Sequence, residues 1–266
     1  MSQTTDRGGR RIHFLEHGEG EPIILVPGLG GGARVFGTLP RRFGRNGFRC
    51  LSVDPVGLPP SGPLPDGEFV FDDAADDLIA VLDATGVERA TLVGTSLGGK
   101  TALTAAARHP ERVARLVMLA SAAYTSQRAR RVYSFFQTIA EKLEPTEFAV
   151  VVAPFLFGRT FHQNLPAVVD DIIRATRPTA DARALMQSQA KALRSFDGLS
   201  LCQAVRCPTL CVAGLEDTLT GVDEVRTTAE AIRTAEYLEI ADAGHTLLLE
   251  SPATFDAVCS FAAARS

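Results

Sequence analysis

The amino-acid sequence lacks three features, each of which would point to a particular class of protein. It has no excess of positive charge, since its formal net charge is −4, and so it carries no electrostatic footprint for nucleic acid. No apolar run approaches the roughly 18 residues of a membrane-spanning helix. The five cysteines are odd in number, and Cys202, Cys207 and Cys211 form no C-x-x-C pair. We therefore expect no nucleic-acid partner, no membrane span and no disulfide scaffold.

The N-terminal stretch MSQTTDRGGRR is polar and lacks the apolar core of a signal peptide. We interpret the cysteines as reduced packing residues, which together with this polar start predicts a cytoplasmic protein. A zinc site on Cys207 and Cys211 would need two further ligands, and none lies nearby in the sequence, so we expect no metal. The sequence leaves a homo-oligomer open.

The length and composition of the chain are those of an ordinary globular protein. The 266 residues match one α/β domain, or one domain with an insertion, and 45% hydrophobic with 22% charged residues is ordinary usage. Short apolar strands are expected at 11–17, 22–27, 48–54, 90–95, 114–120, 208–213 and 236–240. Helices are expected from Asp72 to Gly86, from Leu97, and from Pro252 with Ser251 as its N-cap. This alternation predicts a mostly parallel central sheet with helices on both faces.

Residues 124–195 interrupt the alternation, because their apolar positions have only helical spacing. We expect a helical cap here, the helical insertion, over a core made of residues 1–123 and 196–266. Its phenylalanines are Phe135, Phe136, Phe148, Phe155, Phe157 and Phe161. Most of them are expected to pack helices together, but Tyr124, Phe135 and Phe155 are candidates for lining an apolar substrate pocket.

The stretch LVGTSLGGKTALTAA (92–106) places Ser96 between a strand and a helix, with Gly94 and Gly98 on either side. This is the nucleophile-elbow pattern G-x-S-x-G, in which the glycines remove side chains that would collide across a sharp turn. The alternative is that Ser96 is only an N-cap. The strand before the motif and the helix after it favour a nucleophile.

A serine nucleophile needs a base and an acid, and both follow strands further along the chain. His245 lies in the loop ADAGHTLLLE after the strand at 236–240, and Asp217 lies in GLEDTLT after the strand at 208–213. The order Ser96, Asp217, His245 is the one used by folds with a nucleophile elbow. Glu216 is the alternative acid.

An oxyanion needs preorganised donors, and we expect the backbone N–H groups of Leu97 and of Leu29 in the loop PGLGGG (27–32). The same loop permits a rival interpretation. Residues 28–33 fit G-x-G-x-x-[GA] after a strand, and Asp54 ends the next strand, which outlines a dinucleotide-binding fingerprint. That interpretation leaves Ser96, Asp217 and His245 unexplained.

The chain resembles the α/β-hydrolase superfamily over nearly its whole length. The stretches that carry the resemblance are VPGLGG (26–31), DPVGLPPSG (54–62), VGTSLGG (93–99), GLEDT (214–218) and DAGHT (242–246). It is similar to bacterial esterases, enol-lactonases, carbon–carbon-bond hydrolases and cofactor-free haloperoxidase-like enzymes. Dehalogenases and epoxide hydrolases are disfavoured, because they use aspartate where this chain has Ser96.

Two departures from the family pattern stand out. The first loop usually reads His-Gly, and here Pro27 takes the place of the histidine, so the loop must be anchored differently. The second loop usually carries D-x-x-G-x-G-x-S, and here Leu58-Pro59-Pro60 gives a stiffer course.

Together, these residues predict a serine hydrolase that cleaves a small, largely apolar carboxylic ester or lactone and needs no cofactor. The alternatives are a carbon–carbon-bond hydrolase or lyase on the same triad, and a non-catalytic ligand receptor with the same fold.

Overall fold

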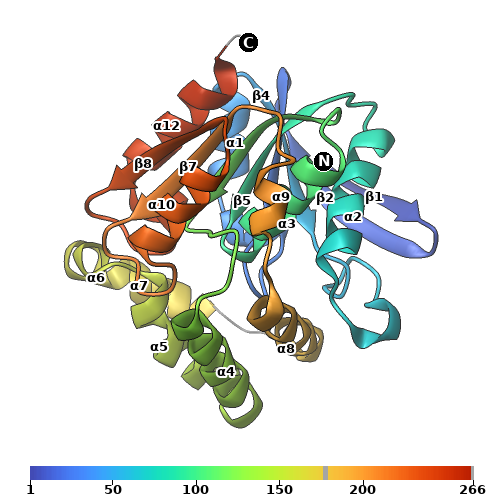
Figure 1. Ribbon diagram of the computed structural model, residues 1–266. Helices are drawn as coiled ribbons and strands as arrows, with labels where there is room; N and C mark the ends of the chain where they lie inside the picture. The colour runs from blue at the N-terminus through green and yellow to red at the C-terminus, as the bar shows by residue number, and fades with distance from the viewer. Residues whose placement is uncertain (176–178, 265–266) are drawn as a thin grey trace.

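The computed structural model describes residues 1–175 and 179–264, which fold around one eight-stranded sheet (Figure 1). The strands are β1 (Ser2–Arg7), β2 (Arg10–His17), β3 (Glu21–Val26), β4 (Phe48–Asp54), β5 (Ala90–Thr95), β6 (Val113–Leu119), β7 (Thr209–Gly214) and β8 (Ala235–Ile240). Their order is β1-β2-β4-β3-β5-β6-β7-β8. The β1–β2 and β2–β4 pairs are antiparallel and all other pairs are parallel. The predicted, mostly parallel sheet is confirmed.

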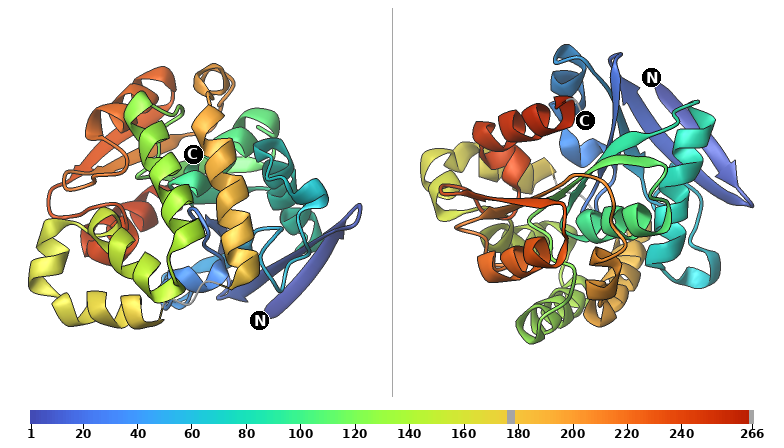
Figure 2. Two further views of the ribbon diagram at one scale, coloured as in Figure 1. Left: turned by 90° about the horizontal axis from the view of Figure 1, so that it is seen from below. Right: turned by 45° about the horizontal axis from the view of Figure 1, so that its top comes forward.

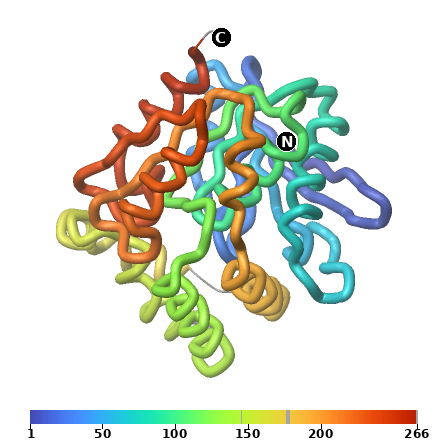
Figure 3. The backbone as a smooth tube through the Cα atoms, viewed as in Figure 1, coloured from blue at the N-terminus to red at the C-terminus, as the bar shows by residue number. Residues whose placement is uncertain are grey.

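Helices cover both faces of the sheet, as predicted (Figure 3). On one face lie α2 (Phe71–Ala84), α3 (Leu97–Arg108), the short α9 (Leu199–Cys202) and α10 (Val222–Ala231). On the other lie α1 (Leu39–Arg45), α11 (Leu247–Glu250) and α12 (Pro252–Ala263). There the rings of Phe43 and Phe255 meet with centroids 4.6 Å apart. Burial on both faces explains why β7 is largely apolar and why every residue of β5 except the last is buried.

The helical insertion connects β6 to β7. It contains α4 (Gln127–Lys142), α5 (Pro145–Leu156), α6 (Arg159–Asn164), α7 (Pro166–Ala175) and α8 (Ala180–Ser195). Seen from below, these helices lie across one edge of the sheet, with α4 beside α8 (Figure 2, left). Two 3-10 turns, η1 (Ala33–Phe36) and η2 (Pro65–Gly67), interrupt loops of the core. Within the described residues, no helix combines the length and apolar character needed to cross a membrane.

The strand β1 was not expected from the sequence. It pairs with β2 from Ser2 opposite Leu15 to Arg7 opposite Arg10, through a turn in which Gly8 and Gly9 both have positive φ. Two such glycines suit the tight turn of a hairpin. The strand was missed because it lies at the sheet edge, where its side chains alternate between exposed and half-buried and carry no apolar pattern.

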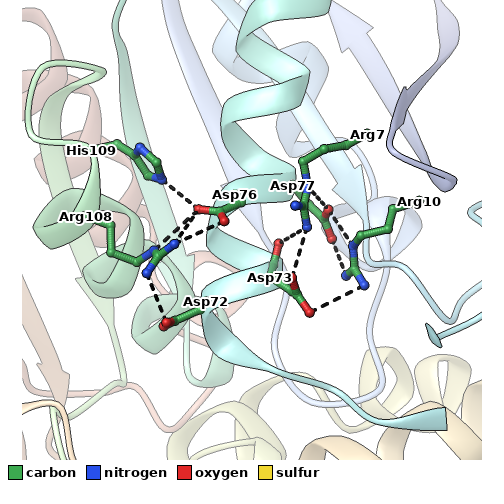
Figure 4. A network of polar contacts seen from close by, with 8 residues as sticks. All are labelled: Arg7, Arg10, Asp72, Asp73, Asp76, Asp77, Arg108 and His109. Carbon is green, nitrogen blue, oxygen red and sulfur yellow. Dashed lines mark hydrogen bonds and ion pairs between the residues drawn. The ribbon is translucent and has the colours of Figure 1, made fainter. Parts of the chain in front are cut away.

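The acidic residues of α2 form ion pairs on both sides of the helix (Figure 4). Asp77 accepts from Arg7 Nε at 2.9 Å and from Arg10 Nη2 at 2.7 Å, which ties α2 to the β1–β2 hairpin. Asp76 faces the end of α3, where Arg108 and His109 donate to it. Asp72 and Asp73, in the first turn of α2, also complement the positive end of the helix dipole. In the structure the same carboxylates also fasten neighbouring elements together.

The start of α12 differs in one detail from the expectation. Ser251 occupies the N-cap position and Pro252 begins the helix, as predicted, but the Ser251 side chain makes no capping hydrogen bond.

Candidate active site

Ser96 occupies a strained turn between β5 and α3. Its φ of 55° and ψ of −117° place it among the few non-glycine residues with positive φ. Such strain persists only where the surrounding structure enforces it, and it gathers at functional sites. The Ser96 hydroxyl makes no capping hydrogen bond to α3. Its strained backbone and the missing capping bond therefore do not fit an ordinary N-cap.

The neighbouring glycines and one serine hold this turn. A Cβ on Gly94 would collide with the backbone of Gly98, and a Cβ on Gly98 would collide with the backbone of Val26. Only glycine fits at either position, so the two close approaches fix the path of the chain. Ser121, after β6, donates its hydroxyl to the Ser96 carbonyl at 2.7 Å.

His245 and Asp217 come together at the carboxyl ends of β8 and β7. The Nδ1 atom of His245 lies 2.8 Å from Asp217 Oδ2, and the two side chains are only 6% and 1% exposed. The other carboxylate oxygen, Oδ1, accepts the N–H groups of Leu219 at 2.7 Å and Thr220 at 3.0 Å. The carboxylate is therefore held by backbone donors, and it presents one oxygen to the imidazole.

Glu216 faces away from His245 and binds the start of α6. It accepts Thr160 N and Thr160 Oγ1, each at 2.7 Å, and Arg159 Nη2 at 3.2 Å. Burial opposes the ionisation of Glu216, but these hydrogen bonds outweigh that effect and lower its pKa. The structure thus pairs Asp217, and not Glu216, with the histidine.

A second carboxylate joins the His245 loop to the helical insertion. Glu250 accepts Thr246 N at 2.9 Å and Gly244 N at 2.8 Å, the two N–H groups that flank His245. It also accepts Gly158 N, just before α6, at 2.7 Å. The loop that carries His245 is therefore packed directly against the insertion.

Ser96 and His245 line one cavity of about 260 Å³ between the sheet edge and the insertion. Apart from these two residues, Tyr133, Thr95 and Thr246, its lining is apolar or glycine. The remaining lining residues are Gly28, Leu29, Gly31, Val35, Phe36, Leu39, Phe136, Phe148, Val152, Leu156, Leu219, Leu248 and Leu249. No Lys, Arg, Asp or Glu belongs to this lining within the described part of the chain.

The three aromatic residues proposed for the pocket do not belong to this lining. Phe135 is 42% exposed, because the adjacent Phe136 takes the inward side of α4. Phe155 is half-buried and packs against Phe136, with ring centroids 5.4 Å apart. Tyr124 lies where the chain enters the insertion, in a bridge with Asp197. Helical spacing indicated where aromatic residues gather, but not which of them face the cavity.

Of the two backbone donors proposed for an oxyanion, Leu29 lines this cavity and Leu97 directly follows Ser96, which lines it. Leu29 and Leu97 both have N–H groups without an acceptor among the described residues. Leu29 lies in a turn closed by a hydrogen bond from Gly31 N to Gly28 O at 3.1 Å, and Gly30 has a φ of 67°. A positive φ at the third residue of a turn is typical of type II geometry and favours glycine.

Two contacts outside the loop anchor it in the absence of the usual histidine. Gly30 N donates to Gln189 Oε1 of α8 at 2.8 Å, and Ala33 N donates to Asp54 Oδ1 at 2.7 Å. Asp54 Oδ2 in turn lies 2.6 Å from His13 Nδ1. Gln189 was not predicted from the sequence, although a polar residue within the apolar side of α8 is a signal for such a role.

The dinucleotide interpretation finds no support in this local structure. The loop leads into η1, which has four residues, and both oxygens of Asp54 are already bound inside the protein. Within the described residues, no group of three or more His, Cys, Asp or Glu side chains could hold a metal ion.

Comparison with known proteins gives a consistent family. The family model described as "alpha/beta hydrolase fold" matches residues 21–252. A 2-hydroxymuconate semialdehyde hydrolase from Pseudomonas sp. (strain CF600) is 28% identical over 264 residues, covering 93% of this chain and 88% of the relative. Serine hydrolase BPHL from Mus musculus is 30% identical over 217 residues, covering 79% of this chain and 68% of the relative.

Among solved structures, the enol-lactonase from Burkholderia xenovorans LB400 superimposes with a TM-score of 0.85. It is 24% identical and covers 97% of this chain and 99% of its own. At this identity the likeness establishes the fold alone.

Proposed function

We propose that this chain, which belongs to the α/β-hydrolase family, is a serine hydrolase of small, largely apolar carboxylic esters or lactones. The relatives and the structural neighbour described above are hydrolases. One observation carries the proposal. His245 is bound to the buried Asp217 carboxylate and shares a cavity with Ser96 on its strained turn. A nucleophile, a base and an acid are thus available at one apolar site.

In the proposed reaction, Ser96 Oγ attacks the carbonyl carbon of the ester. His245 Nε2 takes the serine proton, because Nδ1 is held by Asp217, and then gives it to the departing alcohol oxygen. The products of this half-reaction are an alcohol and an acyl-enzyme. Water, deprotonated by the same imidazole, then attacks the acyl carbon, and the acid leaves while Ser96 regains its proton.

The negative oxygen of each tetrahedral intermediate would be bound by the N–H groups of Leu29 and Leu97. Leu29 lines the cavity, Leu97 follows Ser96 directly, and neither N–H group has a competing acceptor among the described residues. Donors that are already in place need no reorganisation when the charge develops, and each contributes about 10²- to 10³-fold to turnover.

The cavity lining supports an uncharged substrate. Phe136, Phe148 and Leu156 of the insertion would surround an acyl or alcohol chain, with residues 124–195 acting as a lid over the site. No cationic side chain of the described lining could pair with a substrate carboxylate. This favours neutral esters and lactones over carboxylate-bearing substrates.

A second candidate is cleavage of a carbon–carbon bond on the same triad. The relative named 2-hydroxymuconate semialdehyde hydrolase favours it. The lack of a cation in the lining disfavours a muconate as the substrate here, so we place it second.

The test is hydrolysis of p-nitrophenyl esters of increasing chain length, a lactone panel and 2-hydroxymuconate semialdehyde by the wild type and by Ser96→Ala. We expect ester or lactone turnover, lowered about 10⁴-fold or more in folded Ser96→Ala, together with loss of labelling by a fluorophosphonate probe. Activity of Ser96→Ala within about tenfold of the wild type would refute the role of Ser96. Probe labelling without any turnover would indicate a ligand receptor, and turnover of the semialdehyde alone would indicate the second candidate.

A further inference from the structure

The loop that carries Leu29 has few groups that could fix its shape from within. Pro27 has neither an N–H donor nor a polar side chain, and the loop contains four glycines between residues 28 and 32. Glycine is the most permissive residue for backbone conformation. Besides its internal bond from Gly31 N to Gly28 O, the loop is bound from outside by two groups, Asp54 on Ala33 N and Gln189 on Gly30 N.

Of the two anchors, Gln189 binds the loop at the position nearer to Leu29. It accepts the N–H group of Gly30, the residue directly after Leu29, at 2.8 Å. Gln189 thus holds the peptide that follows Leu29. The peptide before Leu29, which carries the Leu29 N–H, is held through Gly28 O by Gly31 N, so the two bonds together set the turn at Leu29. Met186, one helical turn before Gln189, packs on the α-carbon side of Gly30. Both contacts come from α8 of the insertion.

Burying the Gln189 side chain costs free energy, because only part of its amide is hydrogen-bonded. Its side chain is 1% exposed, and its Nε2 group has no partner among the described residues. It lies among Leu185, Ala190 and Leu193 on the buried side of α8, where an apolar residue would avoid burying an unpaired donor. A buried polar group that is only partly satisfied calls for an explanation other than stability.

Gln189 also lies beside the other proposed donor. With Pro27, Leu97 and Thr101 it lines a small internal cavity of about 30 Å³, room for about one water molecule. Gln189, Pro27 of this loop and the first turn of α3 thus border the same small cavity.

We infer that Gln189 is a positioning residue for the oxyanion hole: the helical insertion, through this side chain, sets the direction of the Leu29 N–H group. The inference rests on the proposed function. Without the acceptor, Gly30 N would be left unpaired and the turn would relax toward other arrangements. The oxyanion exists only in the transition state and intermediates, so the loss should appear in kcat and not in KM.

The experiment compares three variants on one p-nitrophenyl ester. Gln189→Met keeps the length of the side chain but removes the acceptor. Gln189→Glu keeps an oxygen at the same place, whether the group is ionised or protonated. Gln187→Met is the matched control. Gln187 lies on the same helix and is half-buried, and within the described residues it makes no hydrogen bond to the loop at 27–32.

We expect kcat of Gln189→Met to fall about 10- to 100-fold with KM within about twofold, which is less than the loss of a whole oxyanion donor. Its affinity for a trifluoromethyl ketone, which forms a charged tetrahedral adduct with a serine, should fall in parallel. Gln189→Glu should recover most of both quantities, and Gln187→Met should match the wild type. If Gln189→Met does not fold, Gln189→Asn, whose amide is one methylene shorter, replaces it.

Two results would overturn the inference: a folded Gln189→Met with kcat within about threefold of the wild type, or a fall in kcat with unchanged affinity for the ketone. Failure of the proposed function looks different. In that case the wild type itself would neither turn over esters nor bind the ketone at Ser96.

Discussion

Replacing Asp217 by asparagine changes the tautomer of His245 without changing the shape of the site. Asp217 Oδ1 accepts two backbone N–H groups, from Leu219 and Thr220. An asparagine must keep its oxygen at that position, because its NH₂ group would face two donors there. The NH₂ group is therefore forced to the place of Oδ2, 2.8 Å from His245 Nδ1 in the wild type.

An NH₂ group at that place can only donate, so His245 Nδ1 must become the acceptor and its proton moves to Nε2. A protonated Nε2 cannot take the proton of Ser96. In comparable triads this change costs about 10⁴-fold in kcat, or about 5 kcal/mol of transition-state stabilisation. The backbone donors make the effect predictable here, because they leave the asparagine a single favourable orientation.

Glu216→Gln is the matched control, one residue away in the same loop. Glu216 binds Thr160 and the exposed Arg159, and a glutamine retains one acceptor for them. We expect a loss below about tenfold, since a pair with an exposed arginine contributes little.

Both variants should be checked for equal folding and assayed on one fast p-nitrophenyl ester at mildly alkaline pH, with the rate of fluorophosphonate labelling as a second readout. Asp217→Asn within about tenfold of the wild type on both readouts would refute the reasoning. A crippled Glu216→Gln beside an active Asp217→Asn would move the acid by one residue.

Three other predictions concern stability, the cavity and a buried lysine. Asp77→Ala removes a buried carboxylate that two arginines share and should lower the free energy of unfolding by about 3 kcal/mol. Asp72→Ala, whose side chain is 62% exposed, should lower it by less than about 1 kcal/mol. Urea melts measure both losses, and equal losses would contradict the argument. Phe148→Ala enlarges the cavity and should raise kcat/KM for longer acyl chains relative to acetate by about tenfold, whereas Phe135→Ala, outside the lining, should leave the chain-length profile unchanged. Burial lowers the pKa of Lys100 to about 7, so above that pH unfolding takes up a proton and the free energy of unfolding rises with pH. Between pH 7 and 9 the free energy of unfolding of the wild type should rise by about 2 kcal/mol more than that of Lys100→Met. Parallel pH profiles of the two proteins would show that the lysine stays charged when folded.

The positions of Ser96, Asp217 and His245 could be predicted because each lies in the turn or loop that follows a strand. Parallel strands end at the same edge of a sheet, so residues after β5, β7 and β8 meet there whatever their side chains pack against. The choice between Asp217 and Glu216 needed more than this, because both follow β7. The structure pairs Asp217 with the imidazole and binds Glu216 to α6.

The cavity wall could not be predicted in the same way. Phe135 and Phe136 are consecutive, and neighbours in a helix point about 100° apart. The apolar stripe of α4 is broad enough to accept either residue as the inward one. Only the packing of α4 against α5 and α8 decides that Phe136 lines the cavity while Phe135 faces outward.

The role of Gln189 in anchoring the loop of Leu29 could not be predicted from the sequence. Its buried neighbours on α8 mark it as a polar residue in an apolar stripe, and a buried amide requires a partner. Its partner is Gly30, 159 residues earlier, and no local pattern connects the two. The loss of the usual histidine at Pro27 indicated only that some other group must anchor the loop. Because that group comes from the helical insertion, a substitution that shifts α8 should alter the chemical step as well as the choice of substrate.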